Sequence, residues 1–437
     1  MRIFFVAQRV PFPPDRGDKI TTFNEVRYLA RHHEVHVFCL ADGIGDLENV
    51  RGLREYATDV TAVPLEKWRS RMRAFWALAS GEPLSVAAFN EPALHAEIGR
   101  KYEALRPDLI MVYSGNVAQY ATAFPGLPRL MQFADLDSLK WAQFAAASPP
   151  PLKWIYRTEQ RRLLAYERDI ATAFDHNLVC TPIERLDFEE LIPGAPVAVV
   201  GNGVDLDYFR SARAPKKPAS MVFTGVMDYW PNIDAVRWFT DEILPLVRRE
   251  LPQAELTICG RRPSSAVRRL ARRPGVSVTG WVPDTRPFLD AAEVFVAPLR
   301  LARGIQNKLL EAMAMGLPVV SSSAAVRATV VPYGDGIVAA DDPKDFAARV
   351  VDLLRNTKYR REMGRKARAA VETHYRWDAQ LAVLDDVISM ITGRPQTMPV
   401  GASSSRHCAT PMESPSDRIA PRISLPSGAG SDKTVDR

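Results

Sequence analysis

VFVAPLRLARGIQNKLLEAMAMGLPVVS, residues 294–321, is the stretch of sequence that decides the fold. Val294–Ala297 is a short apolar run typical of a buried strand, and residues 318–321 form a second such run. Between them, helix formers fill residues 307–315 and end at Gly316, which favours a helix stop. Strand, helix and strand in such a short space predict a βαβ unit with two parallel strands.

The loop of this unit, residues 299–306, predicts a ligand site. It follows the carboxyl end of a strand and leads into a helix N-terminus, where open α/β sheets bind ligands and where an anion is favoured. Arg303 and Lys308 add two cations, and Glu311 lies one turn beyond Lys308. Phosphate at the helix tip and ribose hydroxyls on Glu311 fit this order. The alternative is a structural unit in which Lys308 and Glu311 form an ordinary surface pair.

The motif K-x-x-E-A-M-A-x-G-x-P-V-V, which starts at Lys308, resembles the donor-binding segment of family 4 (group 1) glycosyltransferases. These are retaining enzymes of the GT-B fold, in which two Rossmann-like domains face each other across a cleft. The resemblance implies that Glu311 holds the ribose of a nucleotide sugar and that Arg303 and Lys308 act on its diphosphate. The neighbouring residues implied to bind the donor are Gly304, Ile305, Gln306 and Asn307.

Two more segments resemble donor-binding parts of this family. Residues 221–235 match its first strand and loop in the nucleotide-binding domain, where Gly225 lets the backbone approach the phosphates; taken alone, Gly225 is a plain turn glycine. Gly280, Trp281 and Val282 match the segment that contacts the base through main-chain groups. For the Trp281 side chain we expect packing rather than stacking on the base.

The acceptor side is indicated by two stretches of the first half. Residues 13–19 resemble the family's P-P-x-x-G loop, which implies Gly17 near the donor phosphates and Arg16 and Lys19 as phosphate or acceptor contacts; as isolated residues these two are surface charges. Asp135 and Asp137 follow an apolar strand and could bind an acceptor hydroxyl. A metal is the weaker interpretation, because the resemblance implies none, and a helix N-cap by Asp137 or the serine after it is the simple alternative.

Two departures from the family pattern point to one branch. The family's first Glu, which is separated from the one matched by Glu311 by seven intervening residues, is Arg303 here, and the loop 225–232 lacks the usual basic pair. Sugar transferases associated with bacterial exopolysaccharide and PEP-CTERM (exosortase) systems have a similar R-G-I-Q-N-K-x-L-E-A-M-A-M-G run and a similar opening P-P-D-x-G-D-K. We predict that Arg303 supplies the cation that the 225–232 loop lacks.

Composition sets broad limits on the function. The 437 residues suffice for two or three domains, and a net charge of +6 is a mild excess at this length, with no nucleic-acid-binding signature. The four cysteines are far apart, which predicts reduced thiols and no zinc site. No run is long enough for a membrane helix or a signal peptide, so a cytoplasmic location is the simplest expectation.

Strand and helix signals alternate twice along the chain, which predicts an α/β fold with two doubly wound domains. Strands are expected at 3–7, 34–40, 109–113, 129–133 and 177–180, and again at 221–224, 255–259 and 276–279; helices are expected at 21–31, 233–250, 343–373 and 377–391. The expected domains are 1–197 for the acceptor, a linker at 198–218, 219–375 for the nucleotide sugar, a returning helix at 376–392 and a disordered tail at 393–437.

A basic amphipathic segment covers residues 67–80. Trp68, Met72, Phe75 and Trp76 share one helical face, and basic residues line the rest with no acid between Glu66 and Glu82. We expect this face to pack on the first sheet. Contact with an anionic membrane, at the cytoplasmic face of the inner membrane, is the alternative.

The resemblance, which covers residues 1–392, implies transfer of a sugar from a nucleoside-diphosphate sugar to a glycan or polyprenyl-linked acceptor. It implies no cofactor beyond this co-substrate. Two alternatives stay open: a sugar-nucleotide epimerase, which shares the GT-B architecture, and a non-catalytic scaffold, which the substitution at Arg303 suggests.

Overall fold

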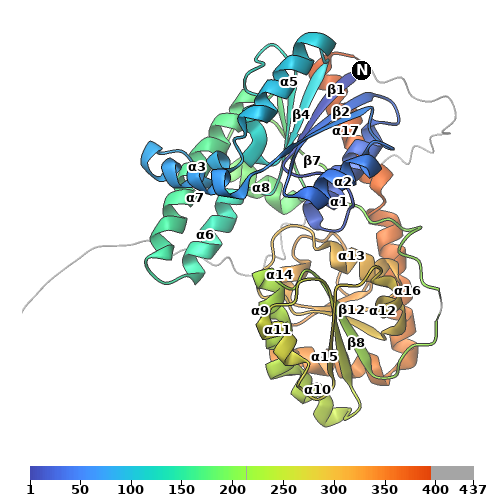
Figure 1. Ribbon diagram of the computed structural model, residues 1–437. Helices are drawn as coiled ribbons and strands as arrows, with labels where there is room; N and C mark the ends of the chain where they lie inside the picture. The colour runs from blue at the N-terminus through green and yellow to red at the C-terminus, as the bar shows by residue number, and fades with distance from the viewer. Residues whose placement is uncertain (213, 395–437) are drawn as a thin grey trace, which may run out of the picture. The chain divides into compact units, whose positions relative to one another are not determined.

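The computed structural model describes residues 1–212 and 214–394 and contains two parallel sheets, each with helices on both faces (Figure 1). The expected tail lies outside the described residues, apart from 393 and 394. In the described part of the chain, no helix is both long and apolar enough to cross a bilayer.

The first sheet has the strand order β3-β2-β1-β4-β5-β6-β7. The strands in this order are β3 (Asp59–Pro64), β2 (Glu34–Ala41), β1 (Arg2–Ala7), β4 (Leu109–Tyr113), β5 (Arg129–Ala134), β6 (His176–Val179) and β7 (Val197–Val199). Its helices are α1 (Gly17–Leu29), α2 (Ile44–Leu53), α3 (Lys67–Ser80), α4 (Leu84–Ala88), α5 (Pro92–Leu105), the 3₁₀ turn η1 (Gly115–Tyr120), α6 (Asp137–Ala147), α7 (Leu152–Ala173) and α8 (Pro182–Leu191). The order changes direction between β1 and β4, which marks the ligand-binding edge of a doubly wound sheet.

The second sheet repeats this pattern as β10-β9-β8-β11-β12-β13. Its strands are β8 (Ser220–Thr224), β9 (Glu255–Cys259), β10 (Val276–Gly280), β11 (Val294–Ala297), β12 (Val319–Ser321) and β13 (Ile337–Ala339). The helices are α9 (Trp230–Trp238), the π-helical turn η2 (Phe239–Ile243), α10 (Leu244–Glu250), α11 (Ser265–Leu270), α12 (Arg286–Ala291), α13 (Asn307–Ala314), α14 (Ser323–Val326), α15 (Pro343–Arg355), α16 (Thr357–His374) and α17 (Trp377–Thr392). The predicted βαβ unit is confirmed, because β11 and β12 pair in parallel on either side of α13.

Helix α17 contributes its apolar side to the core of the first sheet rather than the second. Trp377, Leu381, Leu384 and Ile388 are buried in one cluster with residues of β1, β2 and β4. Its colour at the red end of the bar makes it easy to find among the blue elements of the N-terminal sheet (Figure 1). The last helix of the chain therefore completes a core that the first strands begin.

Three expectations about helices are corrected by the structure. The helix expected at 21–31 begins earlier, at Gly17, and ends at Leu29. The single helix expected at 233–250 is interrupted by the wider turn η2, because Pro245 has no N–H to offer the regular α-helical ladder. The aromatic face of α3 does not pack on the sheet: within α3, all of whose residues the structure describes, only Ala77 is buried.

Candidate functional site

Helix α13 presents its polar side to the loops at the carboxyl edge of the second sheet. Leu309, Leu310 and Met313 are fully buried in the core beneath β11 and β12. Lys308 and Glu311, three residues apart, are left on another side of the helix and are partly accessible. The hydrophobic spacing of this short helix therefore fixes where both predicted donor contacts point.

Lys308 is held by residues of β8 and of α9, the helix that follows it. Its Nζ lies 2.5 Å from Asn232 Oδ1 and 4.8 Å from the centre of the Phe223 ring. Asn232 Nδ2 donates to Val226 O at 2.9 Å, so one amide ties the loop to the lysine. A Cβ added at Gly225 would lie 3.2 Å from Lys308 Nζ and 2.8 Å from Asn232 Nδ2. The two predicted donor residues Gly225 and Lys308 are thus neighbours, and Asn232 is a residue that the sequence reasoning missed.

Burial moves the pKa values of Lys308 and Glu311 toward each other. Desolvation lowers the pKa of Lys308 to about 8, against the opposing effect of Glu311. Desolvation also raises the pKa of Glu311 to about 7, and Lys308 opposes this shift. Within residues 1–212 and 214–394, no ion pair joins the two side chains, so the ordinary surface pair is not what the structure shows. An anionic ligand beside Lys308 would raise its pKa again and so stabilise its charged form.

Arg303 lies in a different electrostatic setting from Lys308. Its Nη2 forms an ion pair at 2.9 Å with Asp187 of α8, and its side chain is 19% exposed. Its Nε is buried without a hydrogen-bond partner in the described part of the chain. Arg303 therefore pairs with one carboxylate through Nη2 and has a second N–H donor, at Nε, without a partner among the described residues. Asp187 was not identified from the sequence, because nothing in the pattern of α8 marks it.

The residues around Arg303 shape the entry to α13. Gly304 has a φ of +61°, and Gln306 Nε2 donates to the Arg303 carbonyl at 2.9 Å, so this turn is closed on itself. Ile305 packs on the hydrophobic core next to α13. Asn307 Oδ1 accepts a 3.1 Å hydrogen bond from Asn202 Nδ2. Ile305 and Asn307 therefore have structural partners of their own.

The segment after β10 differs from the expectation for Trp281. Gly280 has a φ of +73°, a backbone conformation that favours glycine, and Val282 is partly buried. The Trp281 side chain is 70% exposed, so the expected packing role is wrong. An exposed indole beside a chain turn is available for stacking on a planar ligand.

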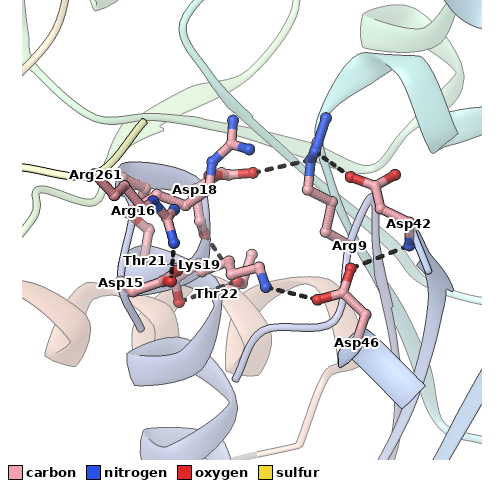
Figure 2. Close-up of polar contacts among 11 residues, drawn as sticks. Arg9, Asp15, Arg16, Asp18, Lys19, Thr21, Thr22, Asp42, Asp46 and Arg261 are labelled. Carbon is pink, nitrogen blue, oxygen red and sulfur yellow. Dashed lines mark hydrogen bonds and ion pairs between the residues drawn. The ribbon is translucent and has the colours of Figure 1, made fainter. Parts of the chain in front are cut away.

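The loop that enters α1 is organised by ion pairs, shown as sticks in Figure 2. Lys19 is buried and its Nζ lies 3.0 Å from Asp46 Oδ1, so it is neither a surface charge nor free to bind a ligand. Arg16 Nε pairs with Asp18 Oδ1 at 2.7 Å on the exposed side of the loop. A Cβ added at Gly17 would meet no heavy atom of the described residues within 4 Å, which leaves open space beside this predicted phosphate contact.

Asp135 and Asp137 stand at the carboxyl end of β5 and form part of an acidic group. Asp137 Oδ2 accepts a 2.9 Å hydrogen bond from Asn116. Burial and the neighbouring Asp137 raise the pKa of Asp135, while Lys140 and Arg303 oppose the shift. The simple N-cap alternative is wrong, since Asp137 is already the first residue of α6 and the Ser138 N–H at this helix start donates instead to Glu167 Oε1 at 3.1 Å.

Glu184 is a further buried carboxyl that sequence reasoning missed. Burial and then Asp135 raise the pKa of Glu184 to about 8. Its Oε2 accepts from Thr181 at 3.0 Å, and its Oε1 is buried without a partner within residues 1–212 and 214–394. A Cβ at Gly304 would lie 3.1 Å from that oxygen. The T-P-I-E sequence from Thr181 is a capping-box pattern that would have marked Glu184 as a structural residue.

Two features limit what else this region offers. A pocket of about 510 Å³, lined by Ser323, Arg327 and Tyr333 among others, contains none of the predicted site residues. In the described part of the chain, no three His, Cys, Asp or Glu side chains are grouped so that they could hold a metal ion. Lys308, Glu311, Gly225 and Asn232 therefore remain the best-defined polar group at the carboxyl edge of the second sheet.

Comparison with known proteins finds similarity in this part of the chain. Residues 218–356 match the family described as glycosyl transferases group 1. A GDP-mannose-dependent monoacylated alpha-(1-6)-phosphatidylinositol monomannoside mannosyltransferase of Corynebacterium glutamicum is 30% identical over 197 residues, which are 40% of this chain and 52% of that protein. The chain spans about half the length, 42–57%, of three curated relatives that it matches.

Solved structures match nearly the whole described fold. Sucrose-phosphate synthase from Thermosynechococcus elongatus aligns with a TM-score of 0.65 at 16% identity, over 90% of this chain and 99% of that one. Anabaena Alr3699/HepE in complex with UDP and glucose aligns with a TM-score of 0.62 at 15% identity, over 89% of this chain and all of that one. The fold is therefore GT-B, and residues 218–356 of the chain are similar to the group 1 glycosyltransferases.

Proposed function

We propose that this chain is a retaining glycosyltransferase that moves a sugar from a nucleoside-diphosphate sugar to a glycan acceptor. The observation that carries the proposal is the contact between Lys308, Asn232 and the Gly225 loop, inside the segment that matches the family. We assign the donor to residues 219–375 and the acceptor to residues 1–197, joined by the linker 198–218 and the returning helix 376–392.

The chemistry asks the protein for position and charge rather than for a cofactor. As the sugar leaves, negative charge grows on the diphosphate, and Lys308, the N-terminus of α13 and the backbone beside Gly225 would stabilise it. Glu311, ionised, would accept hydrogen bonds from the ribose. Holding the acceptor hydroxyl on the same face as the departing phosphate lets that phosphate take the proton and keeps the anomeric configuration.

The remaining predicted site residues are assigned in this proposal to the base, to the backbone turn above the donor, or to the acceptor side. Gly280, Trp281 and Val282 would receive the base, and Gly304 with Gln306 would form the backbone turn above the donor. Arg16, Gly17, Asp135 and Asp137 would line the acceptor side, whereas the ion pair with Asp46 removes Lys19 from direct contact.

We further propose a lipid-linked, polyprenyl-type acceptor and a place in exopolysaccharide synthesis at the cytoplasmic face of the inner membrane. The Corynebacterium relative supports a lipid-linked acceptor, because its name describes transfer to a phosphatidylinositol mannoside. The resemblance to exopolysaccharide sugar transferases supports the pathway. The relatives with a named activity give the epimerase alternative no support, and no observation favours a scaffold.

A donor screen followed by product analysis tests the proposal. UDP-glucose and GDP-mannose are the first donors to try, since a structural neighbour binds the former and the Corynebacterium relative uses GDP-mannose. A donor at about 100 times its Kd should stabilise the protein by roughly 2.7 kcal/mol. Proton NMR of the product from the donor that binds should show the donor's anomeric configuration. Release of free nucleotide with an altered sugar and no transfer would contradict the proposal.

A further inference from the structure

Helix α3 is folded with its large apolar side chains outward. Its inner face consists of Ser70, Arg73, Ala74 and Ala77, which follow helical spacing and are buried or partly buried. The opposite face carries the aromatic residues, and Trp68, Phe75 and Trp76 are 64%, 62% and 65% exposed. A helix that buries small residues and exposes tryptophans has a surface suited to something other than its own core.

A second exposed apolar segment belongs to the same structural unit. Leu152, Trp154 and Ile155 begin α7 and are all exposed. Further along α7, Arg162 donates to the carbonyls of Ala77 and Leu78 at the end of α3. This bond attaches α3 to α7, and both helices are labelled together in Figure 1.

The apolar start of α7 and the end of α3 lie on the same side of α7. Ile155, Glu159 and Arg162 are spaced by four and three residues, so they share one helical face. Glu159 accepts hydrogen bonds from the backbone N–H groups of Leu84 and Ser85, in the chain that follows α3. The face of α7 that carries Glu159 and Arg162 therefore continues, toward the start of the helix, into exposed apolar residues.

The charges around these residues are predominantly positive, although Arg69 also forms an exposed ion pair with Glu66 at 2.9 Å. No acidic residue occurs between Glu66 and Glu82 or between Asp137 and Glu159. Lys67, Arg69 and Arg71 surround the tryptophans of α3, while Arg73 is tied inward to Glu91 at 3.0 Å. On α7, Lys153 and Arg157 flank Trp154 and Ile155. Aromatic residues surrounded by cations are complementary to a partner whose outer layer is anionic and whose interior is apolar.

We propose that the outer face of α3 and the first turn of α7 form one docking surface for an anionic lipid bilayer. Tryptophans fit the headgroup boundary because the indole is apolar over most of its area and has a polar N–H, and flanking cations attract anionic headgroups. The docking surface uses no residue of the donor site. It therefore stands or falls independently of the proposed transferase activity, which a nucleotide-binding measurement reports.

Sedimentation with vesicles tests the proposal. The full chain is mixed with vesicles of phosphatidylcholine and phosphatidylglycerol, and with vesicles of phosphatidylcholine alone. Binding should require the anionic lipid and weaken with added salt. The variant W68A/F75A/W76A and the variant L152A/W154A/I155A should each bind at least about tenfold more weakly. R69Q/R71Q should lose about fivefold for each charge that lies near the bilayer surface.

Matched controls exclude a general effect of surface changes. L186A/Y333A removes equally exposed apolar side chains from other elements, and R361Q/R365Q removes two exposed charges from α16. Both controls should bind vesicles as the wild type does, and all variants should keep the wild-type melting temperature. Unchanged vesicle binding in both apolar variants would overturn the proposal. So would a loss of self-association, measured by light scattering, without a loss of vesicle binding, because the occupant would then be a second copy of the chain.

Discussion

Lys308 and Glu311 are the two residues whose ionisation matters most for the proposed donor site. Burial brings the pKa of Lys308 to about 8 and that of Glu311 to about 7. Because the groups influence each other, the two apparent values belong to the pair. In the proposed site, diphosphate binding would need the lysine protonated, and ribose binding would be strongest with the glutamate ionised. Both conditions hold together only between these values.

We predict a bell-shaped dependence of kcat/KM on pH, rising through about 7 and falling through about 8. Lys308→Arg keeps the charge at high pH, so the alkaline limb should disappear even if the activity is lower. Glu311→Gln cannot ionise, so the acid limb should disappear together with much of the activity. Initial rates from about pH 5.5 to 9.5 measure both limbs. A profile that keeps its alkaline limb in Lys308→Arg would assign that limb to another group.

Substitutions of Arg303 and of its ion-pair partner Asp187 distinguish a role in ligand binding from a purely structural role. If Arg303 binds the diphosphate, Arg303→Ala should weaken nucleoside diphosphate binding by about tenfold or more, Arg303→Lys should recover part of it, and Arg303→Glu should be worse than Ala. Asp187→Asn frees the guanidinium, so it should leave binding unchanged or tighter. Equal losses in Arg303→Ala and Asp187→Asn, with no further loss in the double variant, would make the pair purely structural.

The loop between β8 and α9 depends on close backbone contact with the chain after β9. A Cβ added at Gly260 would lie 1.7 Å from the Gly225 carbonyl oxygen, and Gly260 has a φ of +158°. Gly225 N also donates to Cys259 O at 3.0 Å. The backbone next to Lys308 is therefore positioned by a glycine that does not itself touch the lysine.

Gly260→Ala should destabilise the protein by more than about 1 kcal/mol, since the clash is with backbone, and should also weaken donor binding. Gly99→Ala is the matched control, because Gly99 lies inside α5 and its new Cβ would meet nothing within 4 Å of the described residues. There alanine should be neutral or stabilising by up to about 1 kcal/mol. Chemical denaturation with calorimetric titration measures both effects. Wild-type donor affinity in Gly260→Ala would show that the loop does not need this contact.

Elements with a strong local pattern could be predicted from the sequence, and short elements without such a pattern could not. The runs of β4 and β11 are continuous and apolar, β9 alternates polar and apolar residues, and the bounds of all three were predicted to the residue. The strands β7 and β13 have three residues each and leave no periodicity to detect. In β3, only Val60 is buried, so its hydrophobic signal is weak.

The same limit applies to the candidate site. Gly225, Lys308 and Glu311 were predictable because motif and position at a strand end coincide. Asn232 and Asp187 contact Lys308 and Arg303 from segments 76 and 116 residues away, and only the packed chain shows such contacts. The exposure of the aromatic face of α3 could not be predicted for a different reason. The sequence pattern is that of a helix packed through its aromatic side, but Ser70, Ala74 and Ala77 pack inward instead.

At the scale of the whole molecule, the two ends of the described chain share one core. Leu384 of α17 is fully buried against residues of the first sheet, and Tyr28 of α1 donates a hydrogen bond to Asp385. The hydrophobic core of the N-terminal sheet therefore includes the last helix of the described chain. Elements from the two ends of the sequence pack together here.

Leu384→Ala should lower the free energy of unfolding by about 2–5 kcal/mol, the usual cost of a cavity in a core. Met390→Ala on the same helix is the control, since its side chain is 61% exposed and should change stability by less than about 0.5 kcal/mol. Urea unfolding followed by circular dichroism measures both. Equal stability of the two variants would show that α17 adds little to the N-terminal core.

The most direct test of the central claim is a calorimetric titration of nucleoside diphosphates and their sugars into the full chain. The wild type should bind UDP or GDP and the matching sugar nucleotide. Lys308→Ala and Glu311→Ala should each weaken binding roughly tenfold to a hundredfold while the melting temperature stays constant. Arg361→Ala, an exposed cation on α16, should bind as the wild type does. Absence of any nucleotide binding by the wild type, or wild-type affinity in both site variants, would contradict the account.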